Sequence, residues 1–204
     1  MIVFWDFNGT ILDDLDLCHQ ILNEMLVKHG KKEVTKERYL DIFTFPIKEY
    51  YELAGFDFNE VSFETLALEF IEKYQEASLS LKIHENLIET VKYFKEKGYT
   101  NVVLSASQLD NLLEQMKHYK IDHLFDDILG ITDVYAASKV QVGQDYIKKN
   151  NLEKEDKIMI GDTLHDAQVA LSMGCNVILY TKGHQAKSRF SGYETIDNYK
   201  ELIK

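Results

Sequence analysis

Residues 2–10 read IVFWDFNGT and combine the pattern of a buried strand with a turn that carries a carboxylate. Ile2–Trp5 is continuously apolar rather than alternating, which is typical of a strand covered on both faces. Asp6 follows directly, and Gly9 permits a tight turn and a close approach of the backbone to an anion. A carboxylate at such a position can attack phosphorus and form an aspartyl phosphate. Taken alone, however, the stretch is equally compatible with an ordinary turn.

Four later apolar runs have the same character as Ile2–Trp5. They are Val102–Leu104, Ile128–Ile131, Ile158–Ile160 and Val177–Tyr180. Segments with helical periodicity lie between most of them, at Leu87–Lys97, Leu109–Tyr119, Val142–Lys149 and Asp166–Met173. Gly98 and Gly174 stand where two of these helices should end. The alternation predicts an α/β fold with a Rossmann-like, doubly wound parallel sheet as its core.

The region from about Leu15 to Leu81 breaks this alternation, because it contains no clear buried strand. Its helical patterns are Leu15–His29, Lys36–Phe43, Ile47–Leu53 and Phe63–Ala77. We therefore expect an α/β core of residues 1–14 and 82–204, with residues 15–81 inserted after the first strand as an all-helical cap. Such an insertion would overhang the strand ends and could close over a substrate. An independent all-helical domain is the alternative.

The composition excludes several classes of protein. Hydrophobic residues make up 45% of the 204, which supports a well-formed core, and the net charge of -11 without a basic block argues against nucleic acid as a partner. No apolar stretch reaches the ~20 residues of a membrane span, and no signal peptide is recognisable. Cys18 and Cys175 sit apart in apolar contexts and are expected to be buried thiols. These features together favour a cytoplasmic location, and they leave the oligomeric state open.

Polar residues end several of the predicted strands, among them Asp6, Ser105 and Asp162. Ligands of open parallel sheets bind beyond the carboxyl ends of the strands, so we expect these side chains to converge. Asp166 lies one helical turn after Asp162, on the same face. Carboxylates grouped in this way around Asp6 form a hard oxygen site suited to Mg²⁺. Helix N-capping is the alternative for either later aspartate alone.

Three further residues are candidates for binding a phosphoryl group. The hydroxyl of Ser105 and the ammonium of Lys139 could orient such a group and neutralise its developing charge, and Thr10 can donate a hydrogen bond. Taken singly, Lys139 is equally an ordinary surface lysine, and Ser105 an ordinary strand-end cap. Only their order along the chain makes them informative.

That order resembles the haloacid dehalogenase-like hydrolase superfamily, in particular its phosphoglycolate phosphatase-like branch. The shared pattern is Asp-x-x-Gly-Thr after the first strand, then Ser, then Lys, then Gly-Asp-x-x-x-Asp, and it spans essentially the whole chain. The resemblance implies a Mg²⁺-dependent phosphatase that hydrolyses a small phosphorylated metabolite through an aspartyl-phosphate intermediate. It also implies a helical cap placed after the first motif.

The resemblance also implies roles for individual residues. Asp6 would be the nucleophile, acting with Asn8 and Lys139 as the catalytic group. The metal ligands would be Asp6, the backbone carbonyl of Asn8, Asp162 and Asp166, the last directly or through water. The phosphoryl group would be bound by Ser105, Lys139 and Thr10 and by the backbone N–H groups of Phe7, Asn8 and Ala106.

Asn8 departs from the family pattern, which has at this position an Asp that protonates the leaving group and later activates water. An amide cannot do this, and a positioned general acid–base contributes about 10²–10⁴-fold to rate. The substrate could have a good leaving group, or another group such as His165 or His19 could substitute. Alternatively, turnover is slow and the protein mainly binds a phosphorylated ligand.

The predicted cap raises further alternatives. Lys48 could form a Schiff base, as in phosphonate-cleaving relatives, or bind a substrate carboxylate, although an exposed helical lysine is the simpler interpretation. The aromatic stretch 43–51 could carry specificity residues or build the core of the cap. A metal-free dehalogenase would not need Asp162 and Asp166. Surface positions are expected for the remaining histidines, which are His29, His84, His118, His123 and His184.

Overall fold

The computed structural model describes residues 1–132 and 138–203 and contains a six-stranded sheet in the order β5-β4-β1-β6-β7-β8. Its strands are β1 (Ile2–Trp5), β4 (Thr100–Gln108), β5 (Asp127–Ile131), β6 (Lys157–Gly161), β7 (Asn176–Tyr180) and β8 (Glu194–Ile196). All neighbouring strands are parallel. The chain moves outward from β1 to β4 and β5 on one side and then to β6, β7 and β8 on the other. This reversal beside β1 creates the crevice in which parallel sheets bind ligands.

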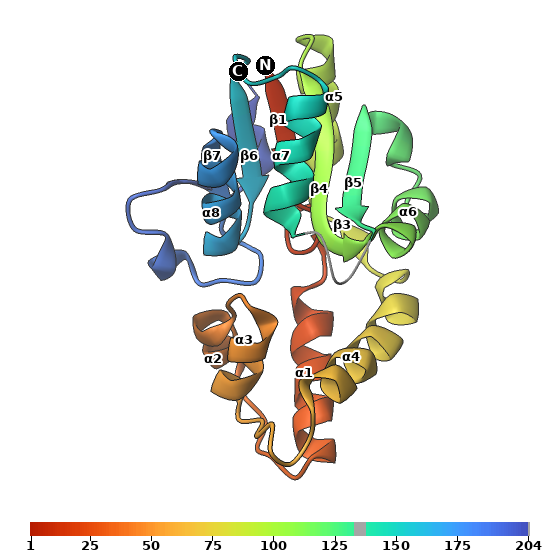
Figure 1. Ribbon diagram of the computed structural model, residues 1–204, viewed down its shortest axis with the longest axis vertical. Helices are drawn as coiled ribbons and strands as arrows, with labels where there is room; N and C mark the ends of the chain where they lie inside the picture. Colours follow the sequence, from red (N-terminus) through yellow and green to blue (C-terminus); the bar gives the residue numbers. More distant parts are fainter. Residues whose placement is uncertain (133–137, 204) are drawn as a thin grey trace.

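Helices cover both faces of this sheet (Figure 1). They are α5 (Leu87–Glu96), α6 (Leu109–His118), α7 (Lys139–Lys149) and α8 (Leu164–Met173). The sequence of β1 is continuously apolar because its successive side chains point to opposite faces of the sheet, and both faces are covered by helices. Ile2 and Phe4 lie in the cluster formed with α7 and α8, whereas Val3 and Trp5 lie in the cluster formed with α5 and α6. The predicted doubly wound α/β fold is confirmed.

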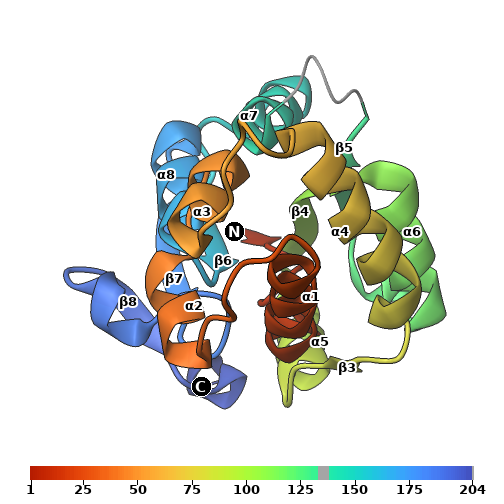
Figure 2. The same ribbon diagram turned by 90° about the horizontal axis from the view of Figure 1, so that it is seen from below.

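Four helices form a separate layer beyond the carboxyl ends of the strands, which we call the cap (Figures 1 and 2). They are α1 (Leu15–Lys28), α2 (Lys36–Ile42), α3 (Ile47–Ala54) and α4 (Phe63–Ser78). The cap has its own core, which includes Leu22 and Leu66. The antiparallel strands β2 (Leu12–Asp13) and β3 (Lys82–Ile83) pair where the chain enters and leaves the cap. The inserted helical cap is therefore confirmed, while its boundaries at residues 15–81 stay a prediction.

Strand β4 is longer than the sequence predicted, since it continues past Leu104 to Gln108. Its pairing with β5 shifts between these two residues. Ser105 therefore lies within an irregular part of the strand rather than after its end. Such irregularities change the direction in which a side chain points and are common beside active sites.

Several short elements gave no periodicity from which to predict them. They are β2, β3 and β8 and the 3-10 helices η1 (Asp122–Leu124), η2 (Lys187–Phe190) and η3 (Tyr199–Leu202). Gly98 and Gly174 follow α5 and α8 with φ values of 76° and 65°, as expected for residues that end helices. Within the described ranges, no helix is long and apolar enough to cross a membrane.

Candidate active site

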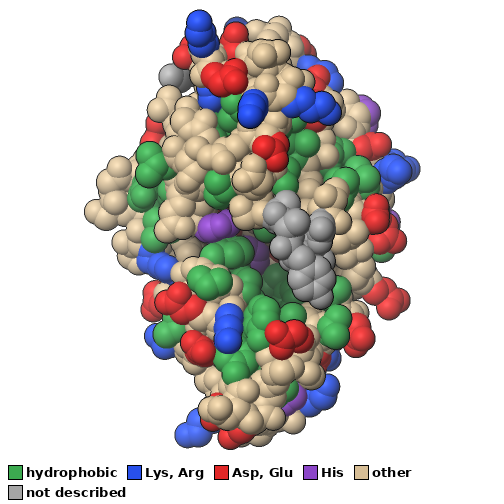
Figure 3. Space-filling view, in the orientation of Figure 1, with side chains coloured by type: hydrophobic (Ala, Val, Ile, Leu, Met, Phe, Trp, Pro, Cys, Tyr) green, Lys and Arg blue, Asp and Glu red, His purple; other side chains and the backbone are tan. Residues whose placement is uncertain are grey.

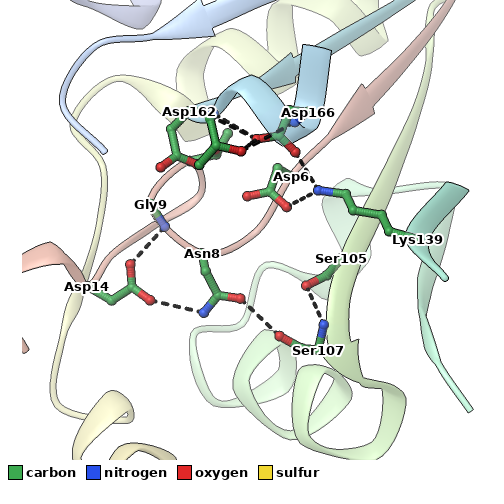
Figure 4. Close-up of polar contacts among 11 residues, drawn as sticks. Asp6, Asn8, Gly9, Asp14, Ser105, Ser107, Lys139, Asp162 and Asp166 are labelled. Atoms are coloured by element: carbon green, nitrogen blue, oxygen red, sulfur yellow. Dashed lines mark hydrogen bonds and ion pairs between the residues drawn. The ribbon is translucent and has the colours of Figure 1, made fainter. Parts of the chain in front are cut away.

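A cavity of about 380 Å³ lies between the carboxyl ends of the strands and the cap. Its core side is lined by residues from four separate parts of the chain, namely Asp6, Ser105, Lys139, Asp162 and Asp166. The expected convergence at the strand ends is therefore observed, and Figure 4 shows Asp6, Lys139 and Asp166 pointing toward one another. Cap residues such as Tyr39, Phe45 and Phe70 line the opposite side of this cavity.

Lys139 is the first residue of α7, which Ser138 caps, and its side chain is buried. Its ammonium contacts Oδ1 of Asp6 and lies 2.6 Å from Oδ1 of Asp166. Burial alone would lower the pKa of Lys139, but the charges of Asp166 and Asp6 outweigh it and raise that pKa. Lys139 therefore stays charged and holds one oxygen of Asp6, which leaves Oδ2 of Asp6 available to a substrate.

Asp162 and Asp166 follow β6 and are positioned differently. Oδ1 of Asp162 accepts a hydrogen bond from the Thr10 hydroxyl at 2.9 Å, and Oδ2 accepts one from the N–H of His184 at 2.7 Å. Oδ2 of Asp166 accepts one from the Thr163 hydroxyl at 2.6 Å, within a reciprocal capping box at the start of α8. Asp166 thus caps α8 and also contacts Lys139. Helix capping and a role in the candidate site are therefore compatible for this residue.

Three carboxylates, those of Asp6, Asp162 and Asp166, place oxygens within 4.8 Å of one another. Among the described residues, Lys139 is the only cation in an ion pair with any of them, which leaves two negative charges when all three carboxylates are ionised. Burial raises the pKa of Asp6 well above its usual range, against the opposing effect of Lys139, and raises that of Asp162 to about 6. Buried oxygen ligands with two unbalanced charges fit a hard divalent cation.

Two glycines leave the space that the Asp162 carboxylate occupies. A Cβ atom at Gly9 would lie 2.3 Å from Oδ2 of Asp162, and one at Gly183 would lie 2.2 Å from the same atom. Gly9 also has a φ of 72°, a left-handed conformation that is unfavourable for residues other than glycine. Glycine at position 9 therefore lets the turn after β1 pack closely against the carboxylate of Asp162.

The side chain of Asn8 is held on both sides of its amide group. Its Nδ2 donates to Oδ2 of Asp14 at 3.0 Å and to the hydroxyl of Tyr74 at 2.6 Å. Its Oδ1 accepts from the hydroxyl of Ser107 at 2.9 Å. Asn8 is therefore fixed between the core and helix α4 of the cap, and Figure 4 shows it below Asp6.

Asp14 and His184 form a buried pair next to Asn8. Nε2 of His184 lies 3.0 Å from Oδ1 of Asp14, and its Nδ1 lies 2.9 Å from the hydroxyl of Tyr39 on α2. Burial opposes the charge on each group, yet the attraction between them dominates. It lowers the pKa of Asp14 and raises that of His184 to about 9. An ion pair thus joins the entrance of the cap to the core.

The predicted surface positions of His184 and His84 are wrong, since both side chains are buried. The ring of His84 contacts the carbonyl of Gly9 at 3.1 Å, while His118 and His123 are exposed as expected. A weak signal for His184 existed, because it lies in the loop that follows β7, at the same edge of the sheet as Asp162. For His84 no pattern in the sequence indicated burial.

Residues 3–180 match the family model of the haloacid dehalogenase-like hydrolases. The chain belongs to that family. It is 25% identical to pyrophosphatase PpaX of Listeria monocytogenes over 95% of this chain and 94% of that one. It is also 28% identical to phosphoglycolate phosphatase of Haemophilus influenzae, over 50% of this chain but only 46% of that relative.

The fold of this hydrolase is similar to the solved structure of a protein described as a predicted phosphatase from Clostridium acetobutylicum. The TM-score is 0.81 at 20% identity, and the match covers 98% of this chain and 95% of the other. The predicted family resemblance and the predicted enzyme class, a hydrolase, are confirmed.

Of the other residues that the sequence suggested for the site, some line the cavity and some do not. Ala106 and His165 line the cavity, and the ring of His165 stacks on Phe45 with centroids 4.3 Å apart. The side chain of Phe7 is in the hydrophobic core, and the Thr10 hydroxyl is bound to Asp162. The phosphate contacts predicted for Phe7, Thr10 and Ala106 stay predictions, and so does the substitution of His165 for the missing acid.

Like the side chains of Phe7 and Thr10, those of His19 and Lys48 do not line the cavity that contains Asp6. The ring of His19 contacts the carbonyl of Val34 at 2.8 Å. The ammonium of Lys48 lies 5.1 Å from the ring centre of Phe58. The structure therefore removes His19 as a substitute for the missing acid, and it removes Lys48 as a Schiff-base lysine or a carboxylate reader.

Both cysteines are free thiols. Cys18 is buried as expected, and it packs within the cap core. Cys175 is only half-buried. No disulfide contributes to the stability of the fold.

Proposed function

We propose that this hydrolase is a Mg²⁺-dependent, phosphoglycolate phosphatase-like enzyme that hydrolyses a small phosphorylated metabolite through an aspartyl phosphate on Asp6. The observation that carries the proposal is the position of Asp6. Its Oδ1 is held by Lys139, beside two further buried carboxylates, and it faces a cavity that cap residues line on the opposite side. The phosphatase names of the curated relatives agree with it.

In the first step, Oδ2 of Asp6 forms a bond to phosphorus while the bond from phosphorus to the leaving oxygen breaks. Lys139 keeps Asp6 oriented and lies close enough to neutralise charge that develops on the phosphoryl oxygens. Ser105 and the N–H groups of the turn after β1 bind the same oxygens. In the second step, water attacks phosphorus, the bond to Asp6 breaks, and the carboxylate is restored.

The carboxylates of Asp6, Asp162 and Asp166, with the carbonyl of Asn8, would hold Mg²⁺. The metal supplies the positive charge that lets an anionic phosphate approach three carboxylates. The residues fit this ion because they offer oxygen atoms only and carry two negative charges more than Lys139 balances. Gly9 and Gly183 make room for Asp162 in this set.

A catalytically weak protein that mainly binds phosphate esters is the second candidate. It is favoured by Asn8, whose amide is fixed and can neither protonate a leaving group nor activate water. The phosphonatase alternative has lost its support, because Lys48 lies outside the cavity.

The test is hydrolysis of a panel of phosphomonoesters and acyl phosphates with Mg²⁺, after chelation, and after readdition of Mg²⁺. We expect turnover that requires the metal and is abolished by Asp6→Asn. Asp16→Asn is the matched control, since that carboxylate lies on the exposed side of α1. Full activity of Asp6→Asn contradicts the mechanism. Phosphate-ester binding without any hydrolysis supports the second candidate.

A further inference from the structure

The cap side of the cavity is apolar, and its aromatic content is high. The residues that form this wall include Phe43, Phe45, Ile47, Phe63, Phe70 and Ile71. Figure 3 shows apolar side chains of the cap gathered around the hollow between cap and core. The hydroxyls of two lining tyrosines are already used, because Tyr39 bonds to His184 and Tyr74 bonds to Asp14. Tyr50, Tyr51 and Gln75 add polar atoms to this wall, but most of its surface offers a substrate stacking and apolar contact.

Positive charge is confined to the core side of the cavity. Among the described lining residues, the cations are Lys139, which is paired with Asp6 and Asp166, and His184, which is paired with Asp14. Residues 133–137 contain no Lys or Arg in their sequence. A carboxylate or second phosphate on the substrate would meet the apolar wall without a counter-charge. Burying such a charge without a partner is unfavourable, so the wall selects against it.

Asn8 lines the same cavity as Asp6 and this wall. The side chain lies below Asp6 and donates to Tyr74 of helix α4 (Figure 4). A leaving group that extends from phosphorus into the cap passes Asn8, whose amide has no acidic proton to give. Its two N–H groups are engaged by Asp14 and Tyr74. A leaving oxygen on this path must therefore depart without protonation from position 8.

We propose that the substrate is an aryl phosphate, a monoester whose leaving oxygen is carried by an uncharged aromatic ring that stacks against the cap. This inference rests on the proposed phosphatase function. Oδ2 of Asp6 forms the bond to phosphorus, and the bond to the aryl oxygen breaks. The phenolate leaves with the electron pair and later takes a proton from water. A phenol has a pKa of about 10, like a tyrosine side chain, so its anion departs far more readily than an alkoxide.

Four substrates separate the contribution of the ring from that of the leaving group. Phenyl phosphate has both features, benzyl phosphate has only the ring, acetyl phosphate has only the good leaving group, and phosphoglycolate has neither. We expect kcat/KM to be highest for phenyl phosphate and lowest for phosphoglycolate, with a ratio of about 100-fold or more. Equal or faster hydrolysis of phosphoglycolate that still requires Asp6 overturns this inference and keeps the phosphatase function. Hydrolysis that survives Asp6→Asn overturns both.

A matched pair of variants tests the wall with substrate reactivity held constant. Ile71 lines the cavity and is 50% exposed, whereas Leu68 on the same helix is 62% exposed and does not line it. Ile71→Arg adds a cation to the wall, so we expect it to lower the preference for phenyl phosphate over phosphoglycolate at least tenfold. Leu68→Arg should leave that preference unchanged. An unchanged preference in Ile71→Arg, or an equal change in both variants, overturns the inference.

Discussion

Nδ2 of Asn8 lies 3.0 Å from Oδ2 of Asp14, so an amide donor meets a buried acceptor beside the proposed nucleophile. The same carboxylate accepts from the N–H of Gly9 at 2.8 Å and from Tyr74 at 2.6 Å. A carboxylate at position 8 would face Asp14 with no proton between them. The departure from the family pattern at Asn8 is therefore matched by an acid six residues later along the chain.

This relationship predicts a stability defect in Asn8→Asp. Two carboxylates at this distance cannot both be ionised without strong repulsion, and one must take up a proton. We expect the free energy of unfolding, measured in urea at pH 7, to fall by about 1–3 kcal/mol. The loss should be smaller at acidic pH, where one of the two carboxylates is protonated and can donate to the other. A single Asn8→Asp variant as stable as the parent contradicts the account.

Gly9→Ala should impair the metal site specifically. Its Cβ would meet the Asp162 carboxylate at 2.3 Å, so one proposed ligand must move. Gly30 is the control, because its φ of 69° is similar and nothing lies within 4 Å of its Cβ position. We expect both variants to lose about 1–2 kcal/mol of stability from backbone strain. Only Gly9→Ala should also weaken Mg²⁺ binding in calorimetry, tenfold or more, and equal affinity in the two variants would argue against this role of Gly9.

Arg189 of the core donates a hydrogen bond to the backbone of the cap, at the end of α2. Its Nη1 lies 2.6 Å from the carbonyl of Phe43, which also accepts from Nε2 of Gln185 at 2.7 Å. Because hydrogen bonds from charged groups contribute about 1.5–3 kcal/mol, Arg189→Ala should disfavour the closed cap and raise KM about tenfold or more. Lys187→Ala should change KM little, because Lys187 binds Asp197 at the exposed surface. Similar KM values for both variants would show that the contact has no part in closure.

The His184–Asp14 pair predicts an alkaline loss of stability. Since folding raises the pKa of His184 from 6.5 to about 9, its contribution is complete below pH 6.5 and is lost as pH rises through 9. The corresponding loss in the free energy of unfolding is about 3 kcal/mol, at about 1.4 kcal/mol per pKa unit. His184→Gln should flatten this part of the profile, measured by urea denaturation without metal. An equal slope in parent and variant would assign the loss to other groups.

Much of the fold was accessible from the sequence because its signals are local. Ile2–Trp5 is apolar on both faces, and α8 carries a capping box at its start and a left-handed glycine at its end. Strand β8 could not be predicted, because a segment of three residues at the edge of a sheet is too short to show a periodicity. The irregular end of β4 around Ser105 was also missed, because it depends on the register with β5.

The candidate site divides in the same way. Asp6, Lys139 and Asp162 were predictable because each stands at a strand or helix end that the sequence indicates. Asp14 and His184 were not singled out, although they are 170 residues apart and only 3.0 Å from each other in the fold. Their roles come from burial and mutual charge, which depend on how the cap packs against the core. The same packing placed Lys48 outside the cavity and the aromatic side chains inside it.

In the proposed mechanism, Asp6 carries the phosphoryl group during turnover. The most direct measurement is acid quenching of the enzyme during turnover of a substrate with a radiolabelled phosphoryl group, followed by digestion and identification of the labelled peptide. We expect label on the N-terminal peptide at Asp6, dependent on Mg²⁺, absent from Asp6→Asn and retained in Asp16→Asn. Steady hydrolysis by an enzyme that never carries label at Asp6, or by Asp6→Asn at the parent rate, would contradict it.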